Sequence, residues 1–90
     1  MKTQTQIIFD GLKKRGHKGE KLITSFMNVG EILLEKAQMG NPNELTEVAF
    51  DIFEHSQMMA KSQGFKSLSL KANKFAEYTK VLIKNHINKR

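Results

Sequence analysis

The stretch Gly40-Asn41-Pro42-Asn43-Glu44 interrupts two long amphipathic segments and decides how they are arranged. Glycine often ends a helix, and asparagine is a preferred N-cap whose side chain accepts a bond from a free backbone N–H. Proline fits the first helical turn, and Glu44 stands three residues after Asn41, where it completes a capping box. Because the connection is short, the flanking helices are predicted to form an antiparallel pair.

Apolar residues recur at helical spacing on both sides of this break. Residues 20–38 carry a stripe of Leu22, Phe26, Val29, Leu33 and Ala37, with Ile23, Gly30 and Leu34 beside it. Residues 42–62 carry Leu45, Val48, Ala49, Phe50, Ile52, Phe53, Met59 and Ala60. The second face is so wide that this helix is predicted to be central and to contact two or more neighbours. Gly30 is predicted to let another helix approach closely.

Two further helices are predicted outside this hairpin. Residues 4–15 place Thr5, Ile8, Phe9 and Leu12 on one face and run into Lys13-Lys14-Arg15-Gly16, a helix end with cations and a glycine turn. After Gly64, residues 66–87 carry a core stripe of Leu68, Ala72, Phe75, Ala76, Thr79, Leu82, Ile83 and His86. The prediction is an all-α, up-and-down bundle of three to four helices in a single domain, 1–90.

Composition narrows the class of protein further. The 90 residues include no cysteine, so neither a disulfide nor a thiolate zinc site is possible. The apolar run Ile7-Ile8-Phe9 is too short for a signal-peptide core or a membrane span. We therefore expect a protein without a transmembrane segment, located in the cytoplasm.

The net charge of +6 is distributed unevenly along the chain. Residues 1–25 carry six Lys or Arg against two Asp or Glu, residues 26–60 carry one against six, and residues 61–90 carry eight against one. Basic segments attract polyanions such as nucleic acid or an anionic membrane surface, although they can also pack beside an acidic middle. The expected polyanion-binding residues are Lys13, Lys14, Arg15, Lys18, Lys21, Lys66, Lys71 and Lys74.

The sequence offers little for catalysis. His17, His55 and His86 are far apart and show no metal-ligand or catalytic spacing. Glu47, Asp51 and His55 stack at i, i+4 and i+8, but they follow the polar side of the helix, where a solvated acidic face is the expectation. We therefore expect a protein that is not an enzyme, with no cofactor, no metal ligand and no catalytic residue.

Two short segments resemble nucleic-acid-binding motifs. Gly16-His17-Lys18-Gly19 looks like the G-x-x-G loop of KH domains, which clamps the backbone of single-stranded nucleic acid. That resemblance covers about ten residues, and the β-sheet of a KH domain has no counterpart in the sequence pattern. Residues 60–65, with Leu70 beyond, are similar to a helix-turn-helix pattern. The pattern requires Leu70 to point inward, whereas the stripe drawn above places it outward.

Alternatives to a polyanion partner rest on apolar side chains. Leu70 and Val81 fall on the far side of the last helix with Tyr78 near its edge, and they could form a partner-binding face. The protein would then be a regulator or adaptor that dimerises or docks on another protein. A third possibility is a surface coat: the Lys-bordered helices and the methionines Met27, Met39, Met58 and Met59 bear a loose likeness to phasins. The prediction placed first is a non-enzymatic binding protein that contacts nucleic acid or another polyanion.

Overall fold

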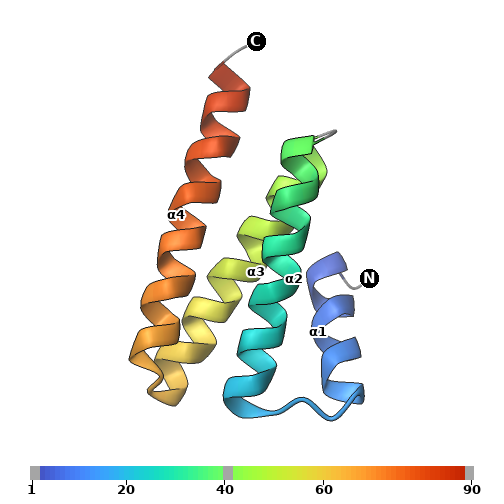
Figure 1. Cartoon of the computed structure of the whole chain (residues 1–90), viewed down its shortest axis with the longest axis vertical. Coiled ribbons are helices and arrows are strands. Elements are labelled where there is room, and N and C mark those ends of the chain that lie inside the picture. Colours follow the sequence, from blue (N-terminus) through green and yellow to red (C-terminus); the bar gives the residue numbers. More distant parts are fainter. Residues whose placement is uncertain (1–2, 40–41, 89–90) are drawn as a thin grey trace.

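The computed structural model describes residues 3–39 and 42–88, which form four helices that run alternately down and up the molecule (Figure 1). They are α1 (Gln4–Lys14), α2 (Gly19–Met39), α3 (Pro42–Gln63) and α4 (Lys66–Asn88). The described residues contain no strand. The predicted all-α, up-and-down bundle is confirmed, and each predicted helix boundary lies within one residue of the observed one.

The turn after α1 is closed by backbone hydrogen bonds. The N–H of His17 donates to the carbonyl of Leu12 (3.3 Å), and the N–H of Gly16 donates to the carbonyl of Lys13 (3.0 Å). This pair of bonds defines a Schellman motif, which satisfies carbonyls that the helix itself leaves unpaired. The motif needs a left-handed residue, and Gly16 supplies it with a φ of +89°.

The turn after α3 uses the same motif. The N–H of Phe65 donates to the carbonyl of Ala60 (2.8 Å), and the N–H of Gly64 donates to that of Lys61 (3.3 Å). Gly64 has a φ of +82°. The Phe65 side chain packs on the cluster that contains Ala60, which is the apolar contact that often accompanies this motif. Both chain reversals at the lower end of Figure 1 are therefore fixed by glycines.

Helix α3 is the centre of the bundle, as its wide apolar face predicted. It packs along α2 and α4 and also contacts α1. It contributes at least one buried residue to each of three apolar clusters: Ile52 with Leu12, Leu22 and Phe26; Ala60 with Ile23, Met27 and Ala72; and Ala49 and Phe53 with Leu34 and Ala76. Because α2 and α4 make only a small contact with each other, the bundle is held together through α3.

Gly30 marks the closest approach of α2 to α3. A Cβ added at this position would lie 3.0 Å from Cε1 and Cζ of Phe53 and 3.1 Å from Cγ2 of Ile52. Phe53 cannot easily retreat, because its ring stacks on Phe75 of α4 with centroids 4.9 Å apart and an interplanar angle of 14°. The prediction that Gly30 admits a neighbouring helix is confirmed.

The core stripe predicted for α4 is also confirmed where the structure describes it. Ala72, Ala76 and Thr79 are buried, and Leu68, Phe75, Leu82 and Ile83 are partly buried. The Thr79 hydroxyl donates to the carbonyl of Phe75 (2.6 Å), so this polar group enters the core with its hydrogen bond made. The side chain of His86 lies outside the described residues, as do Gly40, Asn41 and the side chains of Pro42 and Asn43 in the predicted capping box.

The exposure of single side chains contradicts one observation behind each of two resemblances. The helix-turn-helix pattern requires Leu70 to point inward, but its side chain is 64% exposed. The shared methionine face of the surface-coat alternative does not form among the described side chains, because Met27 is in the core while Met58 of α3 is 70% exposed. No helix in the described ranges combines the length and apolarity needed to cross a membrane.

Two glycine-to-alanine substitutions test the role of Gly30. Alanine in a helix interior is favoured over glycine by about 1 kcal/mol. Gly11→Ala in α1 meets nothing within 4 Å, so it should raise the free energy of unfolding. Gly30→Ala should lower it, because overpacking against Phe53 typically costs about 1–3 kcal/mol.

Chemical denaturation of the two variants and the parent protein measures both effects. The free energy of unfolding that Gly30→Ala removes should be smaller when position 53 is already leucine. The double variant is therefore compared with Phe53→Leu, and Gly30→Ala with the parent protein. Equal stabilisation by Gly11→Ala and Gly30→Ala would contradict the close approach of α2 and α3.

Candidate functional site

The up-and-down topology brings two basic segments to the same end of the bundle. The α1–α2 and α3–α4 connections both lie at the lower end of Figure 1, whereas α2 and α3 join at the upper end. We call this lower end, with its flanking cations, the basic end. Its cationic side chains are all exposed: Lys13, Lys14, Arg15, Lys18, Lys21, Lys61 and Lys66. Glu20 is the one acidic residue in the connecting segments 13–21 and 61–66.

The loop between α1 and α2 is held in place by its own side chains. Nδ1 of His17 lies 3.1 Å from Oγ of Ser25, which ties the loop to α2 in a partly buried position. The ammonium of Lys13 lies 5.6 Å from the centroid of the Phe9 ring, within the range of a cation–π contact. Gly19 has a φ of +55°, so both glycines of the G-x-x-G segment adopt left-handed conformations. The loop joins two antiparallel helices and no sheet accompanies it in the described residues, so its likeness to a KH domain ends with the loop.

The basic end extends from one side of the bundle to the other. Helices α1 and α4 lie on opposite sides and do not contact each other, and the α1–α2 loop leads from the α1 side to the start of α2, which lies between them in this view (Figure 1). Ile23, in the second turn of α2, belongs to the cluster on which Phe65 packs, so the start of α2 lies beside the α3–α4 turn. Lys18 and Lys21 therefore stand between the cations of α1 and those that begin α4.

Not every basic residue of the last helix belongs to this end. Lys71 and Lys74 are exposed one to two turns further along α4, so they extend the basic surface up the side of the bundle. Lys80 and Lys84 lie in the upper half of α4. Sequence analysis missed Lys61, which lies in the last turn of α3. Its position in the sequence, three residues before Gly64, could have indicated that it lies next to the α3–α4 turn.

The acidic residues gather toward the other end. Glu44, Glu47, Asp51 and Glu54 line an open groove of about 580 Å³ between the start of α1 and the first half of α3. Thr3, Gln4 and Thr5 form its opposite side. These acidic residues and the cations of the two lower connections therefore lie toward opposite ends of the molecule, while Lys36, Lys80 and Lys84 lie in the upper half.

Helix dipoles account for some of these charges and not for others. A helix carries partial positive charge at its N-terminus and partial negative charge at its C-terminus. Glu44 in the first turn of α3 and Lys61 in its last turn both match that dipole. Lys66 is the first residue of α4, and the first turn of α4 contains no acidic residue. Its charge, like that of Lys21 near the start of α2, opposes the dipole and is not explained by helix stability.

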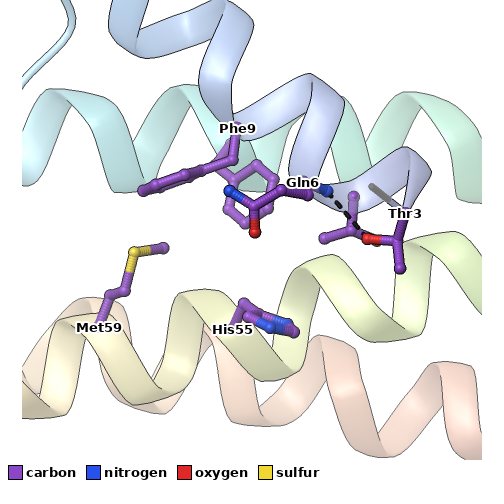
Figure 2. A pocket seen from close by; sticks show the side chains of 7 residues that line it. Thr3, Gln6, Phe9, His55 and Met59 are labelled. Carbon is purple, nitrogen blue, oxygen red and sulfur yellow. Dashed lines mark hydrogen bonds between the residues drawn. The ribbon is translucent and has the colours of Figure 1, made fainter. Parts of the chain in front are cut away.

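A second feature, missed in the sequence, is a small pocket beneath α1. It has a volume of about 110 Å³ and is lined by Phe9 and Gln6 of α1, Phe26 of α2, and His55 and Met59 of α3 among others (Figure 2). Periodicity could not reveal it, because the pocket depends on how α1 is seated on its neighbours. In the described residues, no group of three His, Asp or Glu side chains is arranged to hold a metal ion.

The residues predicted to form a partner face lie on the outer side of α4. Leu70 is 64% exposed, Val81 52% and Tyr78 48%. Lys66, Lys74 and Lys84 share this arc of the helix by their spacing, and Glu77 is its one acidic residue. The predicted exposure of the three apolar side chains is confirmed.

The chain matches no known protein-family model, no curated protein and no solved structure at a significant level. The charge and exposure of the surfaces described above are therefore the basis for assigning a function.

Two charge reversals test whether Lys61 matches the dipole of α3 while Lys66 opposes the dipole of α4. Lys61→Glu and Lys66→Glu remove the same charge from the same end, so the relief of repulsion among the cations is similar in both. Lys66→Glu places an acid where the α4 dipole favours it, and Lys61→Glu places one where the α3 dipole disfavours it. Lys66→Glu should therefore be the more stable variant by roughly 1 kcal/mol.

A difference of this size corresponds to about 4–8 °C in Tm for a domain of this length. Thermal melts followed by circular dichroism measure it. If Lys61→Glu melted at the higher temperature, the assignment of the two helix ends would be wrong.

Proposed function

We propose that this protein is a non-enzymatic binding protein that contacts nucleic acid, or another polyanion, through the basic end. The observation that carries the proposal is the gathering of cations from both lower connections at one end, including Lys21 and Lys66 at helix starts. Cations that oppose a helix dipole reduce stability slightly, so helix stability does not account for Lys21 and Lys66. A bound phosphate would reverse the penalty, because it is attracted both by the ammonium groups and by the helix N-termini.

The dimensions of the bundle suit a nucleic-acid duplex. Its two shorter axes are 27 Å and 23 Å, and the basic end has roughly this cross-section. That is wider than the DNA major groove, which is about 12 Å across, so lysines on the α1 side and on the α4 side could contact phosphates on both strands. With lysines as the principal contacts, binding would depend on the phosphate backbone of the nucleic acid and would show weak preference for its base sequence.

A second candidate function is docking of a protein partner on the outer face of α4. The exposure of Leu70 and Val81 on one arc of the helix favours it. Lys66, Lys74 and Lys84 on the same arc favour an acidic amphipathic helix over a second copy of this chain, whose own lysines would repel them. Such binding would depend on Leu70 and Val81, and would be less sensitive to salt than a phosphate contact.

The polyanion proposal predicts a steep salt dependence. Each lysine that neutralises a phosphate releases a condensed counterion, so log affinity should fall linearly with log salt concentration. A site that engages about five phosphates of duplex DNA gives a slope of about −4 to −5. Replacing Lys13, Lys14 and Lys18 together with Gln should reduce the steepness by about two to three units. Fluorescence anisotropy with a labelled random-sequence duplex measures both slopes.

The matched control replaces Lys36, Lys80 and Lys84 with Gln. These exposed residues lie in the upper half of the bundle, and their loss changes the net charge by the same amount. The control should leave the slope nearly unchanged. Equal effects of the two triple substitutions would attribute binding to net charge alone and reject the basic end as the site. If there were no binding at low ionic strength, the α4 face would become the first candidate, with Leu70 and Val81 as its test positions.

A further inference from the structure

The pocket beneath α1 has two chemically different ends. Phe9 and Phe26 form an aromatic wall, with ring centroids 5.3 Å apart and planes at 63°, and Met59 reaches toward this wall from α3 (Figure 2). Gln6 extends from α1 toward α3, and His55 lies across the gap from it (Figure 2). One end is therefore aromatic and sulfur-lined, and the other carries polar groups.

The hydrogen bonds of His55 determine which atom it offers to a ligand. Its Nδ1 lies 2.8 Å from the backbone carbonyl oxygen of Asp51. A carbonyl oxygen only accepts, so Nδ1 must be the protonated nitrogen that donates. The Asp51 carboxylate, 3.3 Å from the same nitrogen, favours the proton there as well. In the neutral imidazole, Nε2 is then a hydrogen-bond acceptor.

Gln6 adds an acceptor to the same end of the pocket. Its amide nitrogen, Nε2, donates to Oδ1 of Asp10 over 3.0 Å. This bond uses one of the two N–H donors of the amide, and the oxygen Oε1 can accept from a ligand. Each of the two polar side chains that face each other across the gap therefore offers an acceptor to a ligand that donates.

The size of the pocket excludes a ligand larger than a single ring. Its volume of about 110 Å³ is smaller than the cavity of about 150 Å³ that binds benzene in an engineered protein. A ring bound against Phe9 and Met59, above the buried Phe26, would project its polar substituent toward the open, polar end. We propose that the pocket binds a monocyclic aromatic alcohol, with its ring on Phe9 and Met59 and its hydroxyl donated to Nε2 of His55. This site is separate from the basic end, so it goes beyond the proposed function.

Phenol and anisole are the probes that test the proposal, because they share a ring and differ in the hydroxyl donor. Titration of the ¹⁵N-labelled full chain, followed by NMR, should show phenol binding in the millimolar range with shifts centred on Phe9, His55 and Met59. Anisole should bind about tenfold more weakly, since one hydrogen bond of this kind is worth about 1.4 kcal/mol. Replacing exposed His55 with Phe should reduce phenol binding to the anisole level.

A pair of variants locates the site independently of His55. Gln6→Phe places a ring into the pocket and should abolish phenol binding, whereas Ile7→Phe, on the neighbouring exposed position outside the pocket, should preserve it. Spectra of both variants establish that they are folded. Equal affinities for phenol and anisole would overturn the role of His55. Undetectable phenol binding, or binding that survives Gln6→Phe, would overturn the site itself. Neither outcome bears on DNA binding, which is measured without these probes.

Discussion

The close contact between Gly30 of α2 and the side chains of Phe53 and Ile52 on α3 is the constraint on which the rest of the bundle depends. A glycine here allows the α2 backbone to rest directly on two large side chains, one of which is stacked on Phe75 of α4. Three helices are thereby linked through one aromatic pair. Because α2 and α4 contact each other so little, the loss of this contact would loosen the two halves of the core from each other.

The same arrangement determines where the charges lie. Once α2 and α3 are antiparallel neighbours, the first and third connections must fall at one end and the second at the other. The sequence is basic around the first and third connections and acidic on either side of the second. The sign of the charge, which alternates along the chain, therefore differs between the two ends of the bundle. Neither a signal for binding nor a special fold is needed to produce this polarity. What the dipoles do not explain is the placement of Lys21 and Lys66 at helix starts.

Much of the fold could be predicted because its signals are local. Gly16 and Gly64 end helices through backbone conformations that other residues rarely adopt, and the wide apolar face of α3 identified the central helix. The helical period also placed Leu70 and Val81 outside, and that prediction is confirmed over the competing helix-turn-helix pattern. Periodicity identifies a buried face but not the neighbour that covers it. For this reason it could not place Lys61 at the same end as the α1–α2 loop, separate Lys80 and Lys84 from the basic end, or predict the pocket under α1.

The topology creates one basic end, and we propose that this end acts as a single binding surface. The most direct measurement is an NMR map of backbone amide shifts when the labelled protein is titrated with a short DNA duplex at low salt. We expect the shifts to concentrate in residues 13–21 and 61–68, from all four helices at one end, and to leave residues 31–54 nearly unchanged. Shifts centred on the first half of α3, or spread evenly over the chain, would contradict this proposal.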